Sequence, residues 1–114
     1  MPIESLPRES FRSGRLLRDG VWVVAFLAEW CPFCQRFFPE FLALDGGNSF
    51  RTAVGDVTSE ESPLWDEFHI DVVPLVVVFR DGQPTFRWES ELGLGLPPGE
   101  LSRVVSSALD APPP

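Results

Sequence analysis

Residues 21–34 read VWVVAFLAEWCPFC. The first eight, residues 21–28, are all apolar and rich in β-branched and aromatic side chains, which predicts a strand buried on both faces. Pro32 suits the first turn of a helix, because its missing N–H costs nothing there. Apolar side chains then recur at helical spacing, so residues 32–44 are expected to form a helix with a wide apolar face. Cys31 and Cys34 therefore stand where a buried strand is followed by a helix.

This position of the two cysteines indicates redox chemistry. Cysteines three residues apart at a helix start lie on adjacent turns, at a separation that a disulfide can bridge. The N-terminus of a helix offers unpaired N–H groups and a partial positive charge, which favour a thiolate over a thiol. Cys31 is expected to be the nucleophile in thiol–disulfide exchange, and Cys34, one turn further in, the resolving cysteine. The redox-active disulfide Cys31–Cys34 would then replace any bound cofactor.

The composition of the chain excludes several other functions. With two Cys and one His among 114 residues, the four Cys or His ligands of a structural zinc site are not available, so we expect no metal. A purely structural cysteine pair is the less favoured alternative. The net charge is −8, and all nine basic residues are Arg, which argues against nucleic-acid binding. The lone His69 is expected to be a surface residue rather than a catalytic base.

The rest of the chain predicts one α/β domain, residues 1–110, followed by a flexible proline-rich tail, 111–114. The expected order is β-α-β-α-β-α-β-β-α, a central mixed sheet with helices on both faces. Besides the elements above, we expect strands at residues 3–6, 50–57, 72–79 and 84–88, a turn at Asp81-Gly82, and helices at residues 8–17, 59–70 and 100–109.

No targeting or membrane segment is expected. The first twenty residues contain seven charged side chains, so they lack the uninterrupted apolar stretch of about 7–15 residues that a signal peptide needs. The longest apolar run, residues 72–79, is far shorter than the roughly 20 residues that cross a bilayer. We therefore expect a cytoplasmic protein. A periplasmic or other extracytoplasmic location stays open in the case of a removed signal peptide.

Three motifs resemble those of the thioredoxin family. Residues 28–34, Ala-Glu-Trp-Cys-Pro-Phe-Cys, resemble its active-site segment, and Pro39 matches its helix-kinking proline. The run 72–82, Val-Val-Pro followed by an apolar strand and Asp-Gly, resembles its cis-proline strand and hairpin. The resemblance covers nearly the whole chain and implies a thioredoxin fold.

The same resemblance implies where substrates bind. The Val73–Pro74 bond should be cis and face Cys31, leaving the Val73 backbone free to pair with an extended substrate segment. An apolar patch of Trp30, Pro32, Phe33, Val73, Pro74 and the loop 92–96 would surround Cys31. In the alternative interpretation, the loop leucines only cap the sheet. The implied partners are protein disulfides and a redox-partner reductase or oxidase, with the protein acting as a monomer.

Some residues depart from the family pattern. Ala25 stands where many thioredoxins carry a buried Asp that helps to deprotonate the second cysteine, which leaves Glu29 or water for that step. For Glu29 itself, a solvated carboxylate at the loop end is the favoured interpretation. Ala25 and Leu75 support an alternative function, a thioredoxin-fold binding or scaffold module with little turnover. Pro32-Phe33 is similar to the glutaredoxin dipeptide, which makes glutaredoxin-like activity a further alternative.

Overall fold

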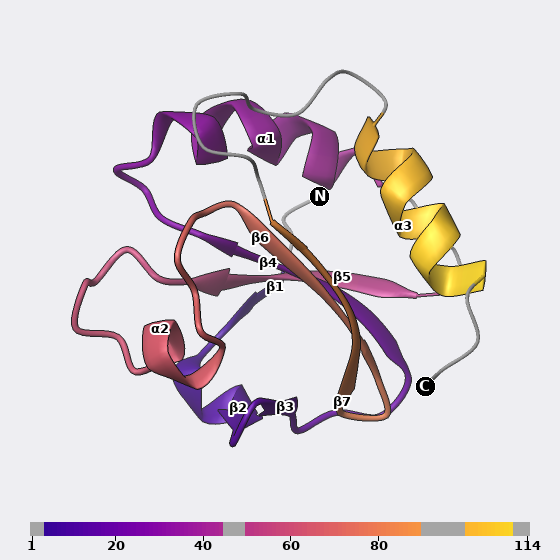
Figure 1. Cartoon of the computed structure of the whole chain (residues 1–114), viewed down its shortest axis with the longest axis horizontal. Helices are drawn as coiled ribbons and strands as arrows, with labels where there is room; N and C mark the ends of the chain where they lie inside the picture. Colours follow the sequence, from indigo (N-terminus) through magenta and orange to yellow (C-terminus); the bar gives the residue numbers. More distant parts are fainter. Residues whose placement is uncertain (1–3, 45–49, 90–99, 111–114) are drawn as a thin grey trace.

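A five-stranded mixed sheet forms the centre of the computed structural model, which describes residues 4–44, 50–89 and 100–110 (Figure 1). The strand order is β1-β5-β4-β6-β7. Strands β1, β5 and β4 are parallel, and β6 and β7 are antiparallel to their neighbours. The strands span Glu4–Leu6 (β1), Arg51–Asp56 (β5), Val21–Leu27 (β4), Leu75–Arg80 (β6) and Gln83–Glu89 (β7). The expected fold class, an α/β thioredoxin fold around a mixed sheet, is confirmed.

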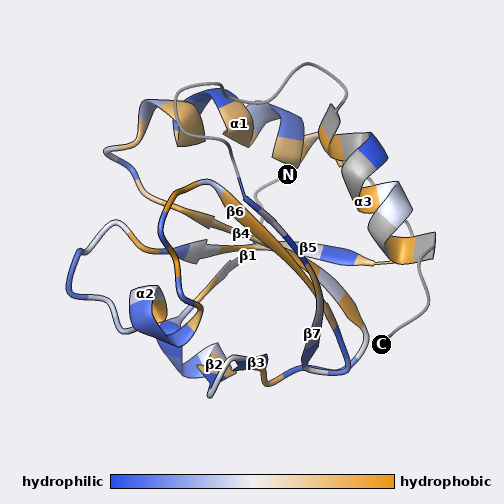
Figure 2. Cartoon of the chain, viewed as in Figure 1, coloured by the Kyte–Doolittle hydropathy of each residue, from blue (hydrophilic) through white to orange (hydrophobic). Residues whose placement is uncertain are grey.

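Both faces of the sheet are covered. Figure 1 places α1 (Pro32–Leu42) and α3 (Glu100–Asp110) on one face. The short α2 (Leu64–Glu67) and the hairpin of β2 (Phe11–Arg12) and β3 (Arg15–Leu16) lie on the other. The two central strands β4 and β6 are the most hydrophobic part of the sheet (Figure 2). This two-sided cover explains why residues 21–28 form an unbroken apolar run rather than an alternating one.

An aromatic cluster fills the face of the sheet that α2 and the β2–β3 hairpin cover. The Phe26 ring, fully buried on β4, packs against Phe68 and Phe11 with ring-centroid distances of 4.9 and 5.5 Å. Phe79 on β6 completes the cluster through contacts with Phe11 and Phe68. Gly55 on β5 lies beneath the Phe26 ring, where an added Cβ would be 2.7 Å from two ring carbons. Only a glycine therefore lets this ring lie against β5.

The prediction of a helix over residues 8–17 is wrong. A short 3₁₀ turn, Arg8–Ser10, leads into the β2–β3 hairpin instead. Ser13 and Gly14 have φ angles of 53° and 78°, which are the backbone angles that a two-residue hairpin turn requires. Phe11 and Leu16 pair across this hairpin, and both are buried. The spacing of these two apolar residues is similar to that on one face of a helix, but here they lie on two strands that face the same core.

The helix expected over residues 59–70 is shortened to α2, Leu64–Glu67. Pro63 has no N–H to extend a helix from the preceding turn, so residues 59–62 form a separate turn closed by a bond from Ser62 N to Ser59 O. The strand expected from residue 72 begins at Leu75. The hairpin turn at Asp81-Gly82 is confirmed, because Arg80 pairs with Gln83 across it. The tail 111–114 and the loop 92–96 lie outside the described residues.

Helix α1 buries only the centre of the apolar face that its sequence predicted, and Leu42 is 45% exposed. Cys34, Phe37 and Phe41 point into the core, and Phe37 stacks on Trp88 of β7 at 6.3 Å between ring centroids. Pro39 lies inside the helix, as expected. Helix α1 ends at Leu42, two residues before the expected end. The helix thus packs across the sheet and holds its N-terminus at the carboxyl end of β4.

Candidate active site

Cys31 occupies the N-cap of α1. Its sulfur accepts a hydrogen bond from the backbone N–H of Cys34 at 3.4 Å, and its own N–H donates to the Ala28 carbonyl at 3.2 Å. Pro32 follows as the first helical residue, where it sacrifices no hydrogen bond. The sulfur therefore lies in the positive field of the helix N-terminus, the setting that stabilises a cysteine thiolate.

The start of β6 completes the surroundings of Cys31. The Cys31 thiol donates to the Val73 carbonyl at 3.6 Å, although 42 positions separate the two residues in the chain. The Val73–Pro74 peptide bond is cis, as the resemblance implied. Both cysteines are free thiols and are almost fully buried, with Cys31 5% and Cys34 3% exposed. The fold thus brings together the cysteine pair and the Val73–Pro74 segment, as the sequence motifs implied.

The two thiols differ in their environment. Burial raises the pKa of the Cys34 thiol from its ordinary 9.0 to about 12. A hydrogen bond with the Ala28 backbone lowers this pKa and offsets part of the effect, whereas the hydrogen bond and the charge of Cys31 raise it further. Cys34 is therefore a protonated thiol at neutral pH, and it must lose its proton before it can act as a nucleophile.

This difference predicts selective alkylation of the reduced protein. Iodoacetamide near pH 7 should modify Cys31 much faster than Cys34, because only a thiolate reacts and burial keeps Cys34 protonated. Modification of Cys34 should rise about tenfold per pH unit towards its pKa of about 12. Peptide mass spectrometry after a short exposure measures both sites, and the guanidinium-unfolded chain, in which both should react, is the control. Equal labelling of the two cysteines in the folded protein would contradict the assignment.

The segment before Cys31 is held by β5 and the turn after it. Thr58 accepts a hydrogen bond from Glu29 N at 2.9 Å through its hydroxyl, and its carbonyl accepts one from the Trp30 indole at 2.8 Å. The Asp56 carboxylate in turn accepts from the Thr58 N–H and hydroxyl, at 2.8 and 2.5 Å. Sequence reasoning missed this support. The Asp-x-Thr spacing, which favours a side-chain-closed turn, was its only local signal.

The expected substrate-binding residues are divided between surface and core. Pro32 is exposed, and Trp30, 52% exposed, stacks against Trp65 of α2 with 9° between the ring planes. Trp65 was not among the expected site residues. Phe33, expected in the apolar patch around Cys31, is half-buried against the core. Val73 and Pro74 are buried, so Val73 contributes its carbonyl to the site.

Two other sequence expectations concern Glu29 and His69. The Glu29 side chain is exposed, as expected. His69 is exposed just after α2, and its carbonyl accepts a hydrogen bond from Arg87. Neither observation brings His69 to the cysteines.

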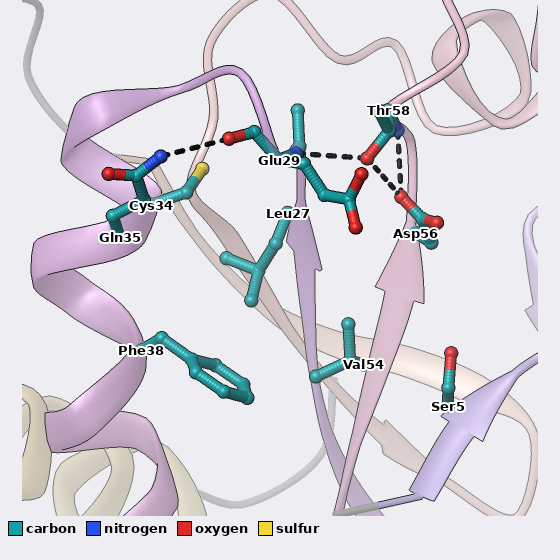
Figure 3. A pocket seen from close by; sticks show the side chains of 10 residues that line it. Ser5, Leu27, Glu29, Cys34, Gln35, Phe38, Val54, Asp56 and Thr58 are labelled. Atoms are coloured by element: carbon teal, nitrogen blue, oxygen red, sulfur yellow. Dashed lines mark hydrogen bonds between the residues drawn. The ribbon is translucent and has the colours of Figure 1, made fainter.

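A pocket of about 390 Å³ opens beside Cys34, between α1 and the β1–β5 side of the sheet (Figure 3). Its floor is apolar, and its rim carries two carboxylates. The lining residues are Ser5, Leu27, Ala28, Glu29, Cys34, Gln35, Phe38, Val54, Asp56 and Thr58. The pocket gives Cys34 a route to water although its side chain is almost fully buried.

Within residues 4–44, 50–89 and 100–110, no three His, Cys, Asp or Glu side chains gather in a way that would bind a metal ion. Among the helices of that same part of the chain, none has the length and apolar character needed to span a bilayer.

The sequence of this chain is similar to parts of several known proteins. Thioredoxin-related transmembrane protein 1 of Bos taurus is 34% identical over 71 residues, 60% of this chain and 26% of that protein. The protein disulfide-isomerase A6 homolog of Drosophila melanogaster is 31% identical over 68% of this chain and 18% of its own length. Thioredoxin of Rhodospirillum rubrum is 29% identical over 65% of this chain and 72% of its own length. The matched region thus spans about a quarter or less of the first two relatives.

The family assignment rests on a longer match. The thioredoxin family model matches residues 3–93, which include every strand of the central sheet, both cysteines and the cis-proline segment. Together with the observed strand order and the N-cap position of Cys31, this match shows that the chain belongs to the thioredoxin family.

Proposed function

We propose that the protein is a thiol–disulfide oxidoreductase that exchanges protein disulfides through Cys31 and Cys34. One observation carries the proposal: the Cys31 sulfur caps α1 and accepts the Cys34 N–H, one turn away from a second free thiol. The names of the relatives, which include thioredoxins and a protein disulfide-isomerase homolog, support this kind of activity. The substrate class and the partners belong to the proposal.

The reaction proceeds by two exchanges. The Cys31 thiolate attacks a substrate disulfide, forms a mixed disulfide and releases one substrate thiolate. Cys34 then loses its proton and attacks the Cys31 sulfur, which closes the Cys31–Cys34 disulfide and releases the second substrate thiolate. The substrate gains two electrons and the protein loses two. A partner reductase restores the dithiol, and an oxidase partner would drive the cycle in the opposite direction.

The surroundings of Cys31 suit a protein substrate. The exposed Trp30 and Pro32 offer apolar contact on one side of the sulfur, and the Val73 carbonyl lies on the other. An extended substrate segment fits between them, with its disulfide next to Cys31.

All of these groups come from one chain, so a monomer is sufficient, and the cysteine pair carries the electrons without a bound cofactor. The dithiol form persists in a reducing compartment, and we place the protein in the cytoplasm.

Reduction of insulin disulfides by dithiothreitol tests the proposal. We expect the wild-type protein to accelerate the reaction, measured as the turbidity of the released B chain. Activity that appears only with glutathione as the reductant would favour the glutaredoxin-like alternative. No acceleration with either reductant would contradict the proposal and favour a binding module.

A further inference from the structure

In the reaction proposed above, Cys34 must lose its proton when it attacks the mixed disulfide, so this resolving step needs a proton acceptor. This requirement rests on the proposed function. Burial, the largest cause of the raised Cys34 pKa, keeps this thiol protonated near pH 7. The β4 and β5 side chains at the level of Ala25 are apolar and cannot take the proton. Ala25 and Leu27 share one face of β4, and Val54 of β5 pairs with Ala25. The acceptor must therefore reach Cys34 from the pocket.

The pocket beside Cys34 brings two carboxylates to the same space. Glu29 comes from the turn between β4 and α1, and Asp56 from the end of β5. Figure 3 shows the Cys34 sulfur on the side of its helix that faces the Glu29 backbone, and the Glu29 carboxylate turned towards Thr58 and Asp56. The volume of about 390 Å³ is ample for several water molecules, since one needs only about 10–15 Å³ on this measure. Water can therefore join the thiol to a carboxylate.

The carboxylate of Asp56 has a structural role. Its Oδ1 accepts both the N–H and the hydroxyl of Thr58, at 2.8 and 2.5 Å. Protonation of this carboxylate would weaken both bonds and release the turn that holds the Glu29 and Trp30 backbone. Asp56 therefore supports the site and is a poor proton acceptor.

The carboxylate of Glu29, unlike that of Asp56, has no structural role among the described residues. Among the residues that the structure describes, none donates a hydrogen bond to its carboxylate. Its backbone, however, is held at both ends. The N–H donates to Thr58 Oγ1 at 2.9 Å, and the carbonyl accepts from the Gln35 side chain at 3.0 Å. The exposed side chain is thus kept at the mouth of the pocket and can pass a proton to bulk water.

We propose that Glu29 accepts, through water in the pocket, the proton that Cys34 loses as it attacks the mixed disulfide. The Cys34–Cys31 bond forms, the bond from Cys31 to the substrate sulfur breaks, and the electron pair leaves with that sulfur. The proton passes to Glu29 and then to solvent or to the departing thiolate. Asp56, through Thr58, acts as a positioning residue.

The charged groups that face Glu29 are few. From α1, the lining residues Cys34, Gln35 and Phe38 include one titratable group, the Cys34 thiol. From β5 and its turn, Val54, Asp56 and Thr58 include one carboxylate, and β1 contributes only Ser5. Among the described lining residues, the titratable groups of the pocket are therefore Glu29, Asp56 and Cys34.

Stopped-flow reaction with Ellman's reagent separates the two steps. Attack by Cys31 releases a first thionitrobenzoate at a rate proportional to reagent concentration. Attack by Cys34 releases a second at a rate independent of it. Glu29→Gln should leave the first phase unchanged and slow the second about 100-fold near pH 7, the low end of general-base contributions. The wild-type second phase should be nearly flat between about pH 6 and 9, whereas that of Glu29→Gln should rise about tenfold per unit.

Two further variants make the test specific. Glu29→Asp keeps a carboxylate and should recover the flat profile with only a partial loss of rate. Asp56→Asn should slow the second phase but keep the flat profile. The proposal is overturned by an unchanged second phase in Glu29→Gln, or by a profile that steepens in Asp56→Asn alone. A wild-type protein without a first phase would instead overturn the proposed function itself.

Discussion

Cys31→Ser is expected to reduce insulin turnover to the rate of dithiothreitol alone. The N-cap position activates a sulfur, and a serine hydroxyl in the same place is not ionised near neutral pH and does not attack disulfides. The substitution removes one buried thiol and adds a hydroxyl that can still cap α1, so the fold should persist. Initial rates of insulin precipitation measure the loss, and far-ultraviolet circular dichroism verifies the fold.

Cys34→Ser is the matched control for this prediction. It leaves the nucleophile in place but removes the resolving thiol, so Cys31 should still form mixed disulfides that only external thiols release. Turnover should then depend steeply on dithiothreitol concentration. Residual catalysis by Cys31→Ser equal to that of Cys34→Ser would show that the roles of the two cysteines are wrongly assigned.

Phe26→Ala is expected to lower the free energy of unfolding by about 3–5 kcal/mol. The Phe26 ring is fully buried at the centre of the aromatic cluster, in contact with Phe11 and Phe68, and its loss leaves a cavity between β4 and α2. Urea unfolding followed by tryptophan fluorescence gives the difference. Phe86→Ala, at a half-buried position on β7, is the control and should cost less than half as much.

The contact with Gly55 provides an internal check on this prediction. An alanine at position 55 meets the Phe26 ring, so Gly55→Ala should destabilise the wild-type protein by about 1–3 kcal/mol. In the Phe26→Ala background the same change has room for its methyl group and should cost little. Additive effects of the two substitutions would show that the ring does not lie over β5 as described.

The central elements could be predicted because their signals are local. An eight-residue apolar run has one simple interpretation as a buried strand, and Pro32 with the following phenylalanines marks a helix start. The β2–β3 hairpin could not be predicted in this way. Its apolar residues serve two short strands, and the positive φ angles at Ser13 and Gly14 left only the Gly as a sequence signal.

The candidate site also has parts that local sequence signals predicted and parts that they did not. The cysteine pair and the Val73–Pro74 segment are contiguous motifs, so the resemblance to the family predicted both as parts of the site. The fold brings Cys31 and Val73 into contact. The support from Thr58 and Asp56, the stacking of Trp65 on Trp30 and the pocket beside Cys34 depend on contacts between distant segments. Apart from the Asp-x-Thr turn, such contacts follow from the packing of β5 and α2 around the site, which no local pattern encodes.

The mass of a trapped intermediate tests the central claim most directly. Reduced Cys34→Ser protein is mixed with a peptide that contains one disulfide, the reaction is quenched with acid, and the adduct is digested without reductant. The account predicts one substrate thiol linked to Cys31, because the N-capping sulfur is the attacking group. Absence of any adduct at Cys31, under conditions where the wild-type protein oxidises to the Cys31–Cys34 disulfide, would contradict it.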